Sequence, residues 1–160
     1  MTEPRSRMTS QADGDQIVLA GSIDETAKLA DLVHRATAGR LVLDLSGVTF
    51  INSLGVRDLI RLQAAAQQAR IAVELRRVSE PIVHQLNMII ATRGNATVVS
   101  FFAPYACDAC GREESLLIDA LAYGKQLARL EPPPMKCPEC GAQMAFNDFP
   151  ERYFSFLTNS

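Results

Sequence analysis

The sequence predicts an α/β domain followed by a small module held together by a metal ion. Strand patterns and helix patterns alternate from Gln16 to Phe102, and such alternation is typical of a largely parallel sheet covered by helices. The run Leu41–Leu45 is almost continuously apolar, as in a strand buried on both faces in the middle of such a sheet. All four cysteines follow this domain in two Cys-x-x-Cys pairs, which indicates a second kind of structure.

Size and composition fit this division. The chain has 160 residues, of which 48% are hydrophobic and 21% charged, the balance of one compact globular domain plus a small module. The formal net charge of -2 argues against a strong electrostatic grip on DNA or RNA. No apolar run reaches the roughly 18 residues that span a bilayer, and the polar start lacks the apolar core of a secretory signal. We therefore expect a cytoplasmic protein without a membrane partner, and we interpret residues 1–14 as a flexible leader.

The first predicted strand covers residues 16–20, and the first predicted helix covers residues 25–36. Ser22 and Asp24 lie between them, where side-chain oxygens can accept hydrogen bonds from the free N–H groups at a helix start. Gly39 ends the helix. The helix is predicted from apolar residues that recur at helical spacing: Leu29, Leu32, Val33 and Ala36.

A long helix is predicted after the central strand. Residues 48–51 lead from that strand to Asn52 and Ser53, a strong N-cap pair, so a helix should cover residues 54–69. Its buried stripe is predicted to contain Val56, Leu59, Ile60 and Ala64 to Ala66.

Two strands and one helix complete the predicted domain. Residues 71–76 alternate apolar and polar, as a strand does, and residues 97–102 are rich in β-branched and aromatic side chains. Ser79 and Pro81 open the helix between them. Its predicted apolar face consists of Ile82, Val83, Leu86, Ile89 and Ile90. This domain is predicted to cover residues 15–103, and a metal-held module residues 104–160.

Two stretches of the first domain resemble the signatures of STAS domains, the anti-sigma factor antagonists. One is Leu41–Val56, with the run DLSGVTFINSLG, and the other is Leu19–Asp24, LAGSID. The likeness covers Gln16–Phe102. It implies a STAS-like mixed sheet covered by helices, in a bacterial signalling regulator that binds an anti-sigma factor or a Ser/Thr kinase-like protein and is switched by serine phosphorylation.

Ser53 falls on the position of the family's phosphate-accepting serine. The family pattern is Asp-Ser-(Ser/Thr)-Gly; here Asn52 replaces the acid, Leu54 replaces the second hydroxyl residue, and Gly55 matches. The resemblance implies that these four residues and Asp24 contribute to partner binding. A phosphate on Ser53 would also meet the free N–H groups and the positive dipole end of a helix. The alternative is that Ser53, like Asp24, only caps a helix.

The four cysteines form two near-identical knuckles, each a Cys-x-x-Cys pair followed by glycine. Four thiolates complete the tetrahedral shell that zinc prefers and leave no open position for water, so the expected ion is a structural Zn²⁺. The ligands are Cys107, Cys110, Cys137 and Cys140. The module resembles a zinc ribbon. Iron held by four thiolates is an alternative; a thioredoxin-like redox centre normally has one such motif rather than two.

The aromatic tail suggests how the two parts fit together. Only residues 103–106 separate the last predicted strand from the first knuckle, and Pro104 stiffens them, so the module should dock on the domain rather than swing on a tether. The candidate interface is aromatic: Phe101, Phe102, Tyr105, Phe146, Phe149, Tyr153, Phe154 and Phe156.

Two other functions compete with partner binding. Zinc ribbons are frequent in transcription accessories, so a nucleic-acid-binding protein is the alternative, although the balanced charge of the module argues against it. An enzyme is not expected, because the sequence offers no nucleophile with a base nearby, no open metal site and no glycine-rich phosphate loop.

Overall fold

The protein contains two sheets. The computed structural model describes residues 6–158. The first sheet has five strands in the order β1-β2-β3-β4-β5. β1 is antiparallel to β2, and the other neighbours are parallel. The strand bounds are Thr9–Asp13, Gln16–Ile23, Arg40–Ile51, Ala72–Arg76 and Thr97–Val98.

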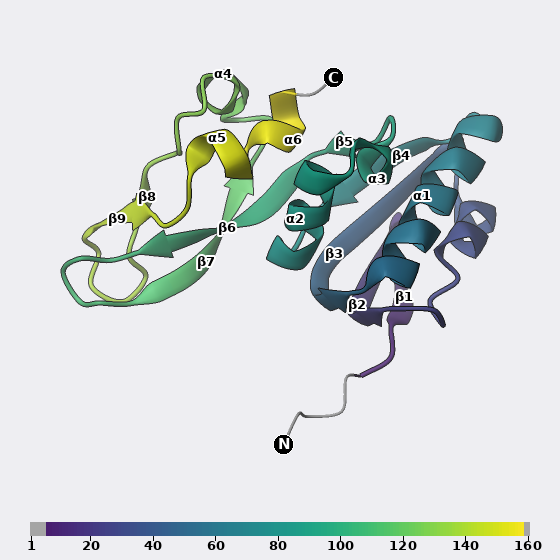
Figure 1. Ribbon diagram of the computed structural model, residues 1–160, viewed down its shortest axis with the longest axis horizontal. Helices are drawn as coiled ribbons and strands as arrows, with labels where there is room; N and C mark the ends of the chain where they lie inside the picture. The colour runs from purple at the N-terminus through teal and green to yellow at the C-terminus, as the bar shows by residue number, and fades with distance from the viewer. Residues whose placement is uncertain (1–5, 159–160) are drawn as a thin grey trace.

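Helices cover one face of the first sheet (Figure 1). Each parallel strand from β2 to β5 lies beside the next one in the chain, so right-handed crossovers place all the connecting helices on the same side. Alternate side chains of β3 and β4 point into the core beneath them, as in Leu43 and Leu75. The helices are η1 (Leu29–Arg35, a 3₁₀ helix), α1 (Ser53–Gln68), α2 (Glu80–Met88) and α3 (Ile90–Arg93).

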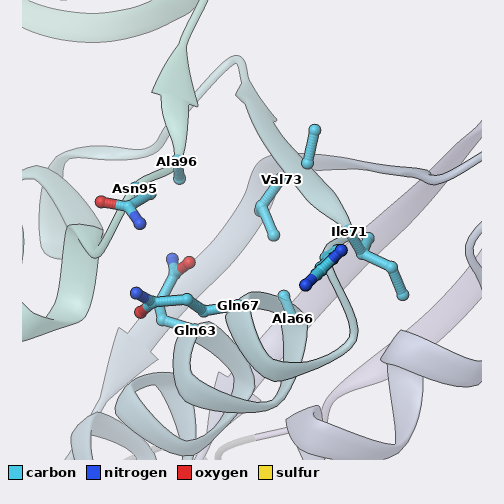
Figure 2. Close-up of a pocket in the computed structure, with 9 residues that line it drawn as sticks. Gln63, Ala66, Gln67, Ile71, Val73, Asn95 and Ala96 are labelled. Atoms are coloured by element: carbon cyan, nitrogen blue, oxygen red, sulfur yellow. The ribbon is translucent and has the colours of Figure 1, made fainter.

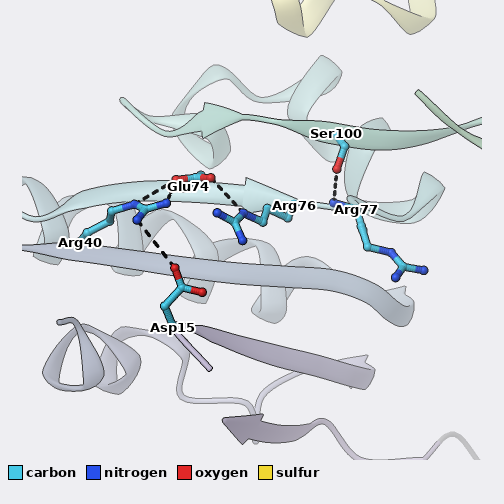
Figure 3. Close-up of polar contacts among 6 residues, drawn as sticks. All are labelled: Asp15, Arg40, Glu74, Arg76, Arg77 and Ser100. Carbon is cyan, nitrogen blue, oxygen red and sulfur yellow. Dashed lines mark hydrogen bonds and ion pairs between the residues drawn. The ribbon is translucent and has the colours of Figure 1, made fainter. Parts of the chain in front are cut away.

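The opposite face of the first sheet carries a polar network (Figure 3). The Arg40 guanidinium donates to Glu74 at 2.6 Å, and Arg76 donates to the other oxygen of the same carboxylate at 2.9 Å. Asp15 completes the network at 3.8 Å from Arg40. Arg40, Glu74 and Arg76 alternate along β3 and β4 with the core residues, so their side chains lie on the face away from the helices.

The second sheet is antiparallel, in the order β7-β6-β9-β8. It holds the cysteine knuckles, and short helices at the end of the chain lie between it and α2 (Figure 1). Its strands are β6 (Ser100–Ala106), β7 (Glu113–Asp119), β8 (Met135–Lys136) and β9 (Gln143–Phe146). The helices are α4 (Gly124–Ala128), α5 (Pro150–Tyr153) and α6 (Ser155–Thr158). The predicted architecture, a mixed sheet with helices followed by a small cysteine-bearing module, is confirmed.

The two parts share one hydrophobic core, as the docking prediction requires. The Phe101 ring lies 5.2 Å from the Phe156 ring and 6.0 Å from the Phe154 ring, centroid to centroid. The Asn87 side chain accepts a hydrogen bond from the Phe156 N–H and donates one to the carbonyl of Tyr153. Most of the predicted interface residues are therefore buried between the parts.

Two of the predicted interface residues lie outside the shared core. Phe149 is 64% exposed and lies under the Arg152 guanidinium. Phe102 is half-buried on the outer side of β6, beneath Arg77. Residue alternation explains Phe102, because its neighbour Phe101 takes the inward position.

The interpretation of residues 1–14 as a leader is wrong for Thr9–Asp13. These residues form β1, which turns at Gly14 and pairs with β2 along its whole length. All five side chains are exposed, so the strand has no apolar alternation by which the sequence could reveal it. Residues 1–5 of the predicted leader lie outside the described residues.

The predicted helix over residues 25–36 is also corrected. The segment begins as a turn, in which the Asp24 carboxylate accepts hydrogen bonds from the backbone and the hydroxyl of Thr26. Lys28 then takes a left-handed backbone conformation (φ 50°), which an α-helix does not accommodate, so only η1 forms. The apolar spacing correctly identifies its buried residues, Leu29, Leu32 and Val33.

Two further boundaries differ from the prediction. Ile89 adopts an extended conformation and ends α2, so Ile90 lies 68% exposed instead of on the apolar face. The strand predicted over residues 97–102 divides at Val99: β5 belongs to the first sheet and β6 to the second. Both segments have strand propensity, and propensity does not indicate which sheet a strand joins.

Candidate functional site: the start of helix α1 and a four-cysteine centre

The start of α1 is held in place by Asn52. Its side-chain oxygen accepts a hydrogen bond from the Gly55 N–H at 2.9 Å, which makes Asn52 the N-cap. Its side-chain nitrogen donates to the Glu25 carboxylate at 3.3 Å, and its backbone N–H donates to the carbonyl of Ile23 at 3.2 Å. The cap therefore joins α1 to the end of β2 and to the turn that follows.

Gly55 lets α1 approach β2 more closely than any other residue would. A Cβ atom built on it would lie 2.1 Å from the carbonyl oxygen of Ile23, far inside contact distance. The glycine of the family pattern therefore has a packing role here. It fixes the height at which the first turn of α1 stands above the sheet.

Ser53 and Leu54 are presented to solvent by this rigid start. Both are exposed, Leu54 at 37%, and the Ser53 hydroxyl makes no hydrogen bond to any residue between 6 and 158. Asn52 thus does the capping, and the Ser53 side chain is left accessible. Of the two interpretations of Ser53, capping by its side chain does not occur in this structure.

Asp24 lies beside this surface because β2 and β3 are parallel and end together, with Ile23 opposite Ile51. The hydroxyl of Thr26 and, with a smaller effect, its backbone N–H donate hydrogen bonds to the carboxylate. These hydrogen bonds lower the pKa of Asp24 below its usual value. Asp24 therefore closes a turn rather than capping a helix, and it adds a negative charge near Ser53.

Two carboxylates of this region were not singled out in the sequence. Glu25 holds the Asn52 side chain, and Asp58 of α1 accepts a hydrogen bond from the backbone N–H of Leu29, at 2.5 Å, at the start of η1. Neither residue belongs to a local motif, since its partner is more than twenty-five residues away. Asp58 lies one turn into α1, and its role could be recognised only from the packing of η1 against α1.

The four predicted metal ligands come together. The sulfur atoms of Cys107, Cys110, Cys137 and Cys140 all lie within 4.8 Å of one another. Cys107 and Cys137, the first cysteine of each knuckle, are buried, and the second of each is exposed. The arrangement can hold a metal ion, and four sulfur donors suit Zn²⁺.

The knuckles have the same backbone geometry. The N–H of Gly111 donates to the carbonyl of Cys107 at 2.8 Å, and the N–H of Gly141 donates to that of Cys137 at 2.9 Å. Both glycines are in the left-handed region, at φ 76° and 75°, where a side chain would be strained. Each sulfur pair is thus positioned by backbone turns rather than by neighbouring side chains.

Backbone N–H groups also act on the acidity of the thiols. Those of Cys140 and Glu139 lower the pKa of Cys137 to about 7, towards the thiolate that binds metals. At Cys110 the backbone N–H of Arg112 acts in the same direction, but partial loss of water around the thiol and hydrogen bonds with the neighbouring thiols outweigh it and raise the pKa to about 12.

A separate cavity of about 330 Å³ lies at the far end of α1 (Figure 2). Gln63 and Gln67 reach it from α1, and Asn95 faces them from the loop before β5. The Gln63 amide is already used, because it donates to the carbonyl of Thr92 at 3.0 Å. No carboxylate, histidine or cysteine lines this cavity, so its lining offers no group for acid–base or nucleophilic chemistry.

Residues 6–93, more than half of the chain, match the family described as Mlab, STAS domain. The chain therefore belongs to this STAS domain family, as the signatures around Asp24 and Ser53 predict. STAS domains generally mediate protein–protein interactions. A search of curated proteins finds no match. Within residues 6–158, no helix is long and apolar enough to cross a membrane.

Proposed function

We propose that this protein is a cytoplasmic signalling regulator of the anti-sigma factor antagonist type, without an enzyme site, that binds a protein partner through the start of α1. The supporting observation is the accessible pair Ser53 and Leu54 on a helix start that Asn52 and Gly55 hold rigidly. A preformed, exposed surface of this kind loses little entropy when a partner docks on it. The proposed partner is an anti-sigma factor or a Ser/Thr kinase-like regulator.

Phosphorylation of Ser53 is the proposed switch. A phosphate would add about -1.5 to -2 charges to a surface that already carries the carboxylates of Asp24 and Glu25. A partner that docks with Leu54 buried would then have to desolvate this charge. The modified protein therefore releases its partner, while the helix start itself tolerates the phosphate through its N–H groups.

The cysteine centre is proposed to be a structural zinc site. Four thiolates leave no coordination position for a substrate or water, so the ion would hold the knuckles together and supply no chemistry. The centre thereby keeps the second sheet folded against α2. This role complements partner binding and requires no catalytic residue.

The switch is tested by affinity purification of the full chain from cells that produce it. We expect wild type and Ser53→Ala to retain the same anti-sigma factor or kinase-like protein and Ser53→Glu to lose it. Thr9→Glu, which adds the same charge on exposed β1, is the matched control and should behave as wild type. A partner retained equally by Ser53→Glu, or phosphate mapped by mass spectrometry to another residue, contradicts the switch.

A further inference from the structure

A two-part groove crosses the junction between the sheets. The first part, of about 400 Å³, lies between the end of β3, the start of α2 and the outer side of β6 and β7. The second part, of about 270 Å³, continues along β7 towards the first knuckle. Glu80 and Ser115 line both parts, so the two parts adjoin. No residue of the cysteine centre or of the start of α1 lines it.

A buried hydroxyl without a partner lies in the first part. Ser79 is only 8% exposed, and its side-chain oxygen makes no hydrogen bond to any residue between 6 and 158. Ser79 is the N-cap of α2, where a serine normally bonds a free N–H of its helix, but here it makes no such bond. Buried polar groups are almost always paired. The oxygen exposes less than 1 Å², so a donor bound in the groove would satisfy it only after the Ser79 side chain rotates towards the groove.

The groove combines apolar walls with unpaired acids. Val48, Pro81 and Phe102 supply apolar surface in the first part. The carboxylates of Glu80 and Glu113 form no ion pair or hydrogen bond within residues 6–158, whereas Glu114 is paired with Arg112 at 2.6 Å. Glu80 stands where the two parts meet. The groove thus offers an apolar wall next to two unpaired carboxylates.

We propose that this groove binds a basic side chain, lysine or arginine, of a protein partner. The methylene stem of such a side chain packs on Val48 and Pro81, beside the Phe102 ring that lies under Arg77, and its charged head pairs with Glu80 where the two parts meet. Glu113 adds a second negative charge in the second part. Long basic side chains bury their stems and keep their heads polar in this way. Charge-assisted hydrogen bonds then supply the selectivity for a cation. The proposal concerns residues outside α1 and does not depend on the switch at Ser53.

The binding test uses two peptides of the same size, in which the cationic guanidinium of one is replaced by a neutral urea in the other. The full ¹⁵N-labelled chain is titrated with acetyl-Leu-Arg-Leu-amide and with its neutral citrulline counterpart, and amide shifts are followed by NMR. We expect the arginine peptide to shift Thr49, Ser79, Glu80 and Ser115 and to bind about tenfold or more tightly than the citrulline peptide. Equal affinities, shifts centred elsewhere, or no shifts with the arginine peptide would overturn the proposal.

Variants of the carboxylates give a second test. Glu80→Gln and Glu113→Gln, combined in one chain, should weaken the arginine peptide about tenfold and leave the citrulline peptide unchanged. Glu131→Gln, an exposed acid that lines neither part of the groove, is the matched control. The amide spectrum of each free variant confirms that the fold is kept. Equal loss in the control variant, or none in the double variant, refutes the assignment.

Discussion

At the scale of single residues, the start of α1 depends on the absence of a side chain. Gly55→Ala would place a methyl group against the carbonyl of Ile23, and the obstacle is backbone, which cannot rotate away. We expect a loss of about 2 kcal/mol or more in the free energy of unfolding, since α1 must lift from β2 to make room. Urea denaturation of the purified variant measures this loss.

Gly124→Ala is the matched control for this substitution. Gly124 begins α4, and a Cβ atom there would meet nothing within 4 Å. Because alanine favours a helix over glycine, stability should stay level or rise by up to about 1 kcal/mol. Equal losses in the two variants would mean that the close approach of α1 to β2 contributes nothing to stability.

The residues of this site show what the sequence can and cannot predict. The pair Asn52-Ser53 correctly indicated a helix start, because cap residues act within three positions of the chain. The sequence does not indicate which of the two residues caps the helix. It also does not indicate that Glu25 accepts a hydrogen bond from the Asn52 amide, because that contact depends on β2 and β3 ending side by side. Contacts of this range carry no local sequence signal.

At the scale of elements, α2 connects the two parts of the chain through hydrogen bonds to the C-terminal tail. The Asn87 side chain binds three groups of the tail: the carbonyl of Tyr153, the hydroxyl of Ser155 and the N–H of Phe156. Arg93 adds a hydrogen bond to the carbonyl of Phe156 at 2.8 Å. α5 and α6 are each only four residues long, too short to be stable alone, so they depend on these contacts.

Asn87→Ala should therefore loosen the tail. The substitution leaves tail backbone groups without partners, and we expect a loss of about 2 kcal/mol in unfolding free energy together with faster amide exchange in residues 150–158. Hydrogen exchange followed by mass spectrometry detects this directly. Asn95→Ala, an exposed asparagine that forms no such bonds, should leave exchange in the tail unaltered. Unchanged protection in Asn87→Ala would show that aromatic packing alone holds the tail.

Element by element, the sequence was most informative where a strand or helix has one apolar side. α1 was predicted to within one residue at each end because its buried residues follow a clear period. The apolar run at residues 41–45 indicated only the first half of β3, because the strand continues through Ser46 and Gly47 to Ile51. β1 was missed because it is an exposed edge strand, and η1 was taken for an α-helix because a 3₁₀ helix buries residues at similar spacing. In both cases the spacing of apolar residues indicated which side chains are buried or exposed, but it did not indicate the backbone geometry.

At the scale of the whole molecule, metal binding and the STAS fold should be coupled. Protein purified without added metal should contain about one zinc ion per chain, by elemental analysis. Chelation should unfold the knuckles and also shift amide resonances of α2, because the tail that packs on α2 belongs to the same core. Restoring zinc should restore the spectrum.

Two results would contradict this coupling or the choice of metal. If the resonances of residues 16–90 stay unchanged while the cysteine module unfolds, the two parts are energetically independent. If the protein as purified holds iron, or no metal at all, the sulfur donors serve another purpose. Both measurements use the full chain, so neither depends on isolating a fragment.

The junction at Val99 has a consequence for how the length of the chain can vary. Only this residue separates β5 from β6, and β6 alternates inward and outward residues without interruption, with Phe101, Ala103 and Tyr105 buried. One inserted or deleted residue here would invert that alternation and turn all three towards solvent. Homologous chains that keep both parts should therefore conserve the spacing across this point, while accepting insertions at surface turns such as the one at Gly14.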